Sequence, residues 1–124
     1  MPKVLRLSEQ YLIRAEAYVQ QEHPDYGKAG SDISVLRTAR YASYGGSTAM
    51  NKENAMDVIE QERVKELYME GDRWYELKRN GCPEWWVISN GLKYTTKAYL
   101  YTSPISKSDV DLNPGLEQNP GYVY

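Results

Sequence analysis

One stretch of the chain, residues 62–81, constrains the fold more than any other part of the sequence. It is too charged for a helix that is buried on every side and too regularly patterned for a loop. Val64, Leu67 and Tyr68 recur at spacings of three and four, which is typical of one face of an amphipathic helix. The pattern therefore predicts a helix that begins near Ala55 and continues into this stretch.

A sharp corner is predicted in the middle of the same stretch. Gly71 tolerates the positive φ that many helix ends require, and Asp72 is a favourable N-cap for a following helix. A second glycine, Gly81, marks the end of that shorter helix. We therefore expect a helix that ends at Gly71, a tight turn and a second helix.

Three glutamates of this stretch, Glu62, Glu66 and Glu70, follow one another at intervals of four residues. Like charges at that spacing repel by a few tenths of a kcal/mol per pair, so the row needs compensating cations. Arg63 and Lys65 lie close enough along the helix to supply some of them. We interpret the row as ion pairing between packed helices.

Two further helices are predicted before this stretch, over residues 5–21 and 28–40, with a turn that contains Pro and Gly between them. Residues 41–54 are polar and favour a loop, and Asn51 or Asn54 can cap the helix that follows. The Gly-Gly-Ser-Thr fragment of this loop lacks the spacing of a phosphate-binding loop, so we expect no nucleotide there.

The character of the sequence changes after residue 81. Residues 82–101 are rich in strand-forming and aromatic types, and Ser89-Asn90-Gly91 is a turn signal, which favours one short strand pair or an extended arm. The tail, residues 103–124, carries three prolines that favour an extended or turning path.

Two motifs follow one another along the chain. Residues 62–81 contain E-R-x-x-E-L-x-x-E-G-x-R-W-x-x-L-x-R-x-G, and residues 104–122 contain P-I followed by N-P-x-L-x-Q-N-P-G-Y. Together they resemble the C-terminal signatures of the SusD/RagB family. The residues of this structural signature are Glu62, Arg63, Glu66, Glu70, Gly71, Arg73, Trp74, Arg79, Asn119, Pro120 and Gly121. The sequence departs from the family pattern where Ser34 replaces a usual Asn and Ser106 a usual Pro.

The resemblance implies a mainly α fold. Residues 1–81 would form tetratricopeptide-like helical hairpins of about four helices. Residues 82–124 would form an irregular, Pro-rich C-terminal segment with little strand, packed on the helices as one structural unit. The resemblance further implies that the chain is the C-terminal portion of a longer family member. It shows no signal peptide or lipid-attachment site of its own.

Charge and composition exclude several classes of site. The formal net charge is −2, which gives no broad electrostatic reason to bind nucleic acid. His23 stands alone in a turn, and Cys82 is a single cysteine, so neither predicts a metal site or a disulfide. The run from Asp109 begins like a calcium loop, but Pro114 and Pro120 occupy the positions of its required Gly and Glu. We therefore expect no cofactor and no metal.

Catalysis is also not expected. A pair of carboxylates across a sugar bond would be needed for glycoside hydrolysis, and ion pairing explains the glutamate row more simply. No Ser-His-Asp, Cys-His or metal-ligand set accompanies these carboxylates in the sequence. We therefore expect a chain that is not an enzyme and has no catalytic residues.

The aromatic residues are the remaining candidates for a binding site. The chain has twelve Tyr, three Trp and no Phe, and Tyr and Trp combine an apolar ring with a polar group. The candidate ligand-binding residues are Trp85, Trp86, Tyr94, Tyr99 and Tyr101. They either stack on sugar rings or pack under the tail and against an absent part of the protein. Trp74 and Tyr75 follow helical periodicity, so we expect them in the core.

The family resemblance implies a non-catalytic protein that binds oligosaccharides. Family members are lipoproteins on the surface of the bacterial outer membrane, and they deliver glycans to a TonB-dependent transporter. The alternative is a helical-repeat scaffold for protein–protein interaction, with no sugar site in this segment. Because two hairpins are few for a repeat array, we also expect the isolated chain to self-associate or to expose an apolar patch where a missing neighbour would pack.

Overall fold

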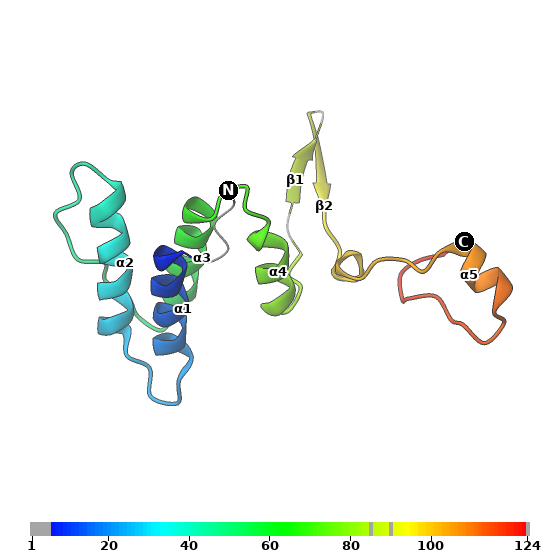
Figure 1. Cartoon of the computed structure of the whole chain (residues 1–124), viewed down its shortest axis with the longest axis horizontal. Helices are drawn as coiled ribbons and strands as arrows, with labels where there is room; N and C mark the ends of the chain where they lie inside the picture. Colours follow the sequence, from blue (N-terminus) through cyan, green and yellow to red (C-terminus); the bar gives the residue numbers. More distant parts are fainter. Residues whose placement is uncertain (1–5, 85, 90, 124) are drawn as a thin grey trace. The chain divides into compact units, whose positions relative to one another are not determined.

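The computed structural model describes residues 6–84, 86–89 and 91–123 and is mainly helical, which confirms the predicted fold class (Figure 1). The helices are α1 (Leu7–Gln20), α2 (Tyr26–Arg40), α3 (Ala55–Glu66), α4 (Asp72–Arg79), the 3₁₀ helix η1 (Ala98–Tyr101) and α5 (Lys107–Leu112). The strands are β1 (Trp86–Ser89) and β2 (Leu92–Thr95). Within the described residues, no helix combines the length and the apolarity that crossing a membrane requires.

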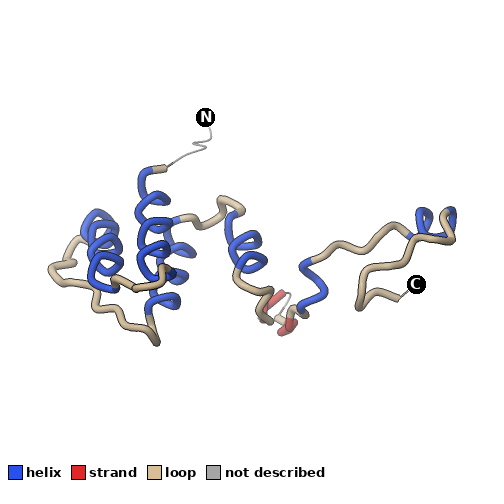
Figure 2. The backbone as a smooth tube through the Cα atoms, turned by 90° about the horizontal axis from the view of Figure 1, so that it is seen from below, coloured by secondary structure: helices blue, strands red, loops and turns tan. Residues whose placement is uncertain are grey.

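The chain divides into two compact units, one that ends at Arg73 and one that begins at Trp74. We call them the N-terminal unit, described over residues 6–73, and the C-terminal unit, described over residues 74–84, 86–89 and 91–123. Figure 2 shows that helices dominate the first and that long irregular segments connect the elements of the second. The expected packing of residues 82–124 on the helices as one structural unit stays a prediction.

The core of the N-terminal unit lies where α1 packs against both α2 and α3 (Figure 1). Leu12, Ile33 and Ile59, one from each helix, are fully buried there. Ala15 and Ala29 are also fully buried, and their small side chains let α1 and α2 approach closely. These positions recur at helical spacing along each element, so one apolar stripe per helix builds the core.

The predicted corner exists but begins earlier than expected. Helix α3 ends at Glu66, and Leu67, whose side chain is buried in the core, already has non-helical dihedral angles. Met69 and Gly71 then adopt positive φ values of 60° and 82°. The expectation that the helix continues to Gly71 is therefore wrong by one turn, because a left-handed residue at Met69 cannot continue a right-handed helix.

A β-hairpin and a short helix structure the C-terminal unit. Strand β1 pairs antiparallel with β2, with Trp86 opposite Thr95 and Ser89 opposite Leu92, which confirms the predicted strand pair. Helix α5 replaces part of the tail that was expected to be irregular. Its first turn carries Asp109, where a carboxylate is favourable near the helix N-terminus.

Candidate functional site

The signature glutamates pair with arginines from other segments of the N-terminal unit. Glu62 on α3 is almost completely buried and accepts a hydrogen bond from Arg37 Nε on α2 at 2.9 Å. Glu66, one turn later, accepts two hydrogen bonds from Arg40, at 2.8 Å and 2.6 Å. Glu62 and Glu66 are therefore compensated by cations from α2 rather than from their own helix.

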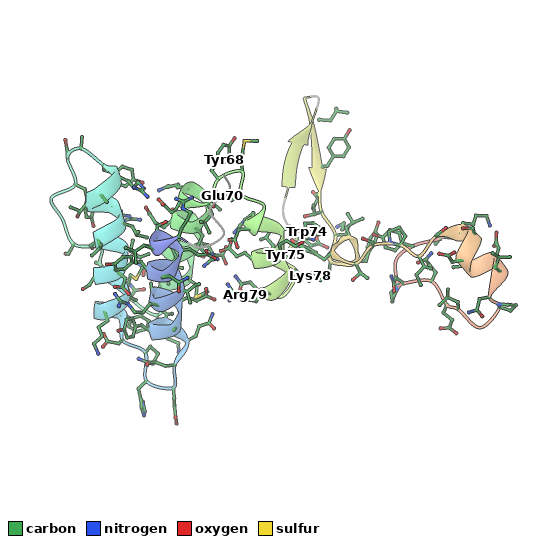
Figure 3. The ribbon with its side chains drawn as sticks, viewed as in Figure 1. Tyr68, Glu70, Trp74, Tyr75, Lys78 and Arg79 are labelled. Carbon is green, nitrogen blue, oxygen red and sulfur yellow. The ribbon has the colours of Figure 1, made fainter. Side chains whose placement is uncertain are left out.

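A further arginine connects the same row to the start of α1. Arg6 donates to Glu66 Oε1 at 2.6 Å and also binds Glu70, which is labelled in Figure 3. The paired Arg40 guanidinium, with Ser8 and Arg6 as further contributors, lowers the pKa of Glu66 to about 2. Glu66 therefore stays ionised at neutral pH and holds three segments of the chain together.

Intrahelical partners were expected from Arg63 and Lys65, and for Arg63 the structure gives a different role. The Arg63 side chain is buried and donates from Nη2 to Asp72 Oδ2 at 3.1 Å, which links α3 to the first residue of α4. Arg73 donates to Glu60 Oε2 at 3.4 Å. Two arginines of the signature therefore attach residues 72 and 73 to α3.

Helices α1 and α2 are joined by an ion pair that the sequence analysis missed. Arg14 donates from Nε and Nη2 to the two carboxylate oxygens of Asp32, at 2.8 Å and 2.6 Å. The Asp32 carboxylate is almost completely buried, whereas about half of the Arg14 side chain is exposed. Asp32 and Arg14 lie on different helices, so no helical spacing in the sequence relates one to the other.

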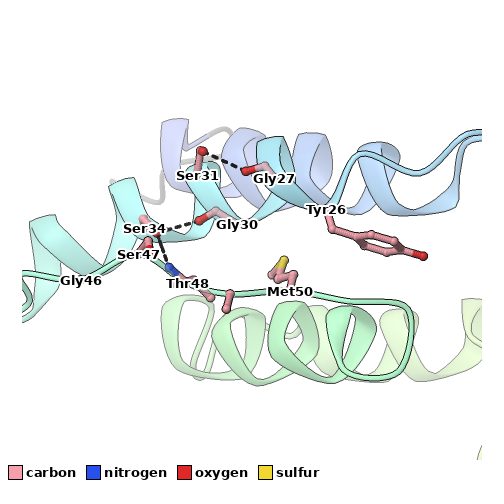
Figure 4. A pocket seen from close by; sticks show the side chains of 10 residues that line it. Tyr26, Gly27, Gly30, Ser31, Ser34, Gly46, Ser47, Thr48 and Met50 are labelled. Atoms are coloured by element: carbon pink, nitrogen blue, oxygen red, sulfur yellow. Dashed lines mark hydrogen bonds between the residues drawn. The ribbon is translucent and has the colours of Figure 1, made fainter.

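A pocket of about 450 Å³ lies between α2 and the segment that precedes α3 (Figure 4). Its lining consists of Tyr26, Gly27, Gly30, Ser31, Ser34, Gly46, Ser47, Thr48, Ala49 and Met50. The Ser34 hydroxyl donates to Gly30 O at 2.7 Å and accepts from Thr48 N at 2.9 Å. The Ser34 hydroxyl therefore attaches the loop to α2.

Tyr44 completes this attachment. Its hydroxyl lies 2.7 Å from Thr48 Oγ1. The hydrogen bonds with Ser34 and Thr48, with a contribution from Arg37, lower the pKa of Tyr44 below its ordinary value. These bonds occupy the hydroxyl groups at this end of the pocket. We therefore assign to this region the positioning of residues 44–50.

The five aromatic candidates of the sequence analysis are placed unequally. Tyr94 on β2 is 50% exposed, and Tyr99 on η1 is 39% exposed. Tyr101 is buried, with 3% of its surface exposed. Trp85 lies outside the described residues, and nothing is placed for the side chain of Trp86. Their roles as ligand contacts stay predictions.

Tyr99 and Tyr101 both contact other aromatic rings of the C-terminal unit. The Tyr99 ring meets the Tyr122 ring edge-on, with centroids 5.1 Å apart. The Tyr101 ring stacks on Trp74 at a centroid distance of 4.7 Å and an interplanar angle of 22°. The Tyr101 hydroxyl donates to Pro83 O at 2.8 Å, which fixes this ring.

The expectation that Trp74 and Tyr75 belong to the core is wrong. Trp74 is 42% exposed and Tyr75 is 72% exposed. Helix α4 instead buries Glu76 and Leu77, while Tyr75 is largely exposed and Trp74 is about half-exposed. An eight-residue helix is too short for periodicity alone to decide which face is covered.

The tail signature binds the backbone of its own unit. Gln118 pairs with Ile105 through both its amide oxygen and its amide nitrogen, at 2.8 Å and 2.9 Å. Asn119 Nδ2 donates to Ser103 O at 2.7 Å, and the Tyr122 hydroxyl donates to Thr102 O at 2.9 Å. The Q-N-P-G-Y motif thus closes the tail onto residues 102–105.

The described residues were searched for side chains that could bind a metal ion. Among them, no group of three or more His, Cys, Asp and Glu side chains is placed to hold one.

The described residues form an ion-paired helical scaffold and a set of partly exposed aromatic rings. Chemically, exposed rings bind the apolar faces of ligands and neighbouring polar groups bind their rims.

The chain is similar to known proteins along nearly its whole length. The SusD family model matches residues 2–122. Starch-binding protein SusD from Bacteroides thetaiotaomicron is 32% identical over 125 aligned residues, which cover 96% of this chain and 21% of that protein. The chain therefore spans about a fifth of the length of the curated relative that it matches. No solved structure matches it.

Proposed function

Because this chain belongs to the SusD family, we propose that it is part of a longer, non-catalytic protein that binds glycans. The observation that carries the proposal is the family match over residues 2–122, which spans both signature motifs. The relative from Bacteroides thetaiotaomicron, named as starch-binding, supports an oligosaccharide as the ligand class.

The N-terminal unit serves this function as a scaffold. Its ion pairs join α1, α2 and α3 through buried carboxylates, of which Asp32 and Glu62 are clear cases. Breaking one member of such a pair leaves a charge without its partner in a poorly hydrated place, which is costly. These ion pairs therefore hold α1, α2 and α3 together within the N-terminal unit.

The sugar contacts that we propose come from the aromatic residues after α4. Tyr94 and Tyr99 expose enough ring surface to meet a ligand, and Trp85 and Trp86 are further candidates from the same segment. Tyr101 is buried, so we assign it a supporting role. Aromatic rings suit the apolar faces of sugar rings, while nearby polar groups suit their hydroxyls.

We place this protein in a nutrient-uptake system at the bacterial cell surface. In this proposal it is a lipoprotein on the outer membrane, and it passes oligosaccharides to a TonB-dependent transporter. Family membership supports this placement. The isolated chain would then lack its natural neighbours and self-associate through surface that these neighbours normally cover.

A second function, as a protein–protein interaction scaffold, is favoured by one observation. Leu7 is 74% exposed, and Ile13 is also exposed. Together with Gln10, Tyr11 and Arg14, these residues line a hollow of about 290 Å³ on α1. Exposed apolar surface with a polar rim is typical of protein contacts.

Isothermal titration calorimetry with neutral and acidic oligosaccharides decides between the two functions. We expect saturable binding of at least one oligosaccharide by the folded chain, weakened in a Tyr94→Ala variant. Tyr41→Ala, which removes an exposed ring from the N-terminal unit, serves as the control and should bind as the native chain does. A folded chain that binds none of the oligosaccharides favours the scaffold function for this segment.

A further inference from the structure

We propose that Trp74, Tyr75 and Lys78 on α4 form a platform on which a pyranose ring of an oligosaccharide stacks. This inference rests on the proposed function and names a site within it. It assigns a binding role to residues of the first signature motif, which the sequence analysis placed in the core. The geometry of α4 and of the Trp74–Tyr101 pair carries it.

The indole of Trp74 is held in place from one side. Tyr101 stacks on it at 4.7 Å, is itself buried, and is fixed by its hydrogen bond to Pro83 O. The 42% of Trp74 that remains exposed is the surface that Tyr101 does not cover. A ring that is already fixed before binding loses little conformational entropy when a ligand stacks on it.

The rest of the platform follows from the period of the helix. Glu76 and Leu77 are buried, each with 3% of its surface exposed, and they define the inner face of α4. At 3.6 residues per turn, Tyr75 and Lys78 lie opposite that face, and Trp74, three residues before the buried Leu77 and one turn before Lys78, lies at the boundary between the two faces. Figure 3 labels the three residues on α4. Tyr75 is 72% exposed and extends the ring surface next to Trp74.

The chemistry of this face fits a sugar better than a protein. The centre of a protein interface is enriched in Tyr, Trp and Arg but depleted of Lys, so Lys78 is the residue of this face that favours a sugar over a protein. Here Lys78 follows Trp74 by one turn, and Arg79 follows Tyr75 by one turn, so cationic groups border both rings. A pyranose ring offers an apolar C–H face and a rim of hydroxyl oxygens. The rings match the face, and the Lys78 ammonium is a donor for the rim.

Calorimetric titration of three variants tests the platform, with maltoheptaose, cellohexaose and a galacturonate hexamer as the probes. Tyr75→Ala removes an exposed ring, and Trp74→Phe keeps packing against Tyr101 but shrinks the outer surface. For the probe that the native chain binds, we expect each variant to bind about three- to tenfold more weakly. Tyr68→Ala, which removes an exposed ring from the N-terminal unit, is the matched control and should leave binding unchanged. Circular dichroism of each variant checks that it is folded.

The outcomes separate this inference from the function on which it rests. Native affinity in both Tyr75→Ala and Trp74→Phe, with loss in Tyr94→Ala, overturns the platform and leaves the proposed function standing. A native chain that is folded and binds none of the three probes overturns the proposed function for this segment, and the platform with it. If Tyr75→Ala abolishes self-association in sedimentation experiments and leaves sugar binding intact, the face is a protein contact and the platform is overturned.

Discussion

Gln118 holds the peptide groups of Ile105 by its single side-chain amide. Its Oε1 accepts from Ile105 N at 2.8 Å, and its Nε2 donates to Ile105 O at 2.9 Å. A primary amide carries one acceptor and one donor group side by side, so it satisfies both backbone groups of one residue as a neighbouring strand would. This explains in physical terms why an amide suits position 118 of the Q-N-P-G-Y motif.

Replacing Gln118 with Ala should loosen the closure of the tail. The change removes the two hydrogen bonds with Ile105 and the one that Gln118 Oε1 accepts from Asn119 N at 2.9 Å. Each contributes about 1 kcal/mol net, and the Ile105 groups must then bind water instead. We expect faster hydrogen exchange at the Ile105 amide, measured by NMR spectroscopy. Glu117→Ala, at the exposed neighbouring position, should leave that exchange rate unchanged. Equal exchange rates in the native chain and in Gln118→Ala would contradict the assigned role.

A glycine is required at position 121 for two independent reasons. Its φ is 90°, which residues with a Cβ rarely adopt, and a Cβ there would lie 2.5 Å from Cγ of Tyr99. Gly121→Ala should therefore displace the Tyr99 ring from Tyr122 and destabilise the C-terminal unit by about 1–3 kcal/mol. The near-ultraviolet circular dichroism of the tyrosines reports the displacement.

Gly115→Ala is the matched control for this prediction. A Cβ at Gly115 meets only the Asn113 side chain, at the ordinary contact distance of 3.6 Å, and no positive φ is required. This variant should retain the native tyrosine signal. If Gly121→Ala and Gly115→Ala give the same tyrosine signal, contact with the Tyr99 ring is not the reason that position 121 requires glycine.

Elements with several turns and one apolar stripe are predictable from this sequence. The expected helices over 5–21 and 28–40 correspond to α1 (Leu7–Gln20) and α2 (Tyr26–Arg40). The second begins two residues earlier than predicted because the Asp25 side chain accepts from Lys28 N and caps it. Periodicity identifies such helices because packing and local pattern agree.

Features that depend on tertiary contacts were not predictable. Helix α3 ends at Glu66 because Leu67 and Met69 adopt non-helical dihedral angles, and arginines on α2 rather than on the same helix pair with Glu62 and Glu66. The exposed position of Trp74 depends on which face of a short helix the rest of its unit covers. The spacing of residues within one helix does not say which arginine pairs with a glutamate or which face of α4 is covered.

The stability of the N-terminal unit should fall in acid through Glu66. Its pKa in the folded protein is about 2, below the ordinary 4.5, so ionised Glu66 stabilises the folded state. The stabilisation is complete above about pH 5 and is lost as the pH falls from 4.5 towards 2. It amounts to roughly 3 kcal/mol, and urea denaturation at a series of pH values measures it.

Glu66→Gln is the informative variant for this pH dependence. It should be less stable at pH 7 and should lose less stability between pH 5 and pH 2 than the native chain. Glu22→Gln, on the exposed turn before α2, should keep the native pH dependence. If the free energy of unfolding of Glu66→Gln changes with pH as it does in the native chain, other carboxylates cause the loss of stability in acid.

Gly30 on α2 lies tightly against the loop that precedes α3. A Cβ at this position would lie 2.2 Å from the backbone oxygen of Thr48, so the backbone of the loop must move to make room. Gly30→Ala should therefore destabilise the chain by about 1–3 kcal/mol, although Ala is the better helix former. Gly27→Ala on the same helix meets only the Asp25 side chain at 3.5 Å and should be neutral or slightly stabilising. Thermal unfolding followed by circular dichroism compares the two variants, and a Gly30→Ala chain as stable as Gly27→Ala would show that the loop is not held against α2.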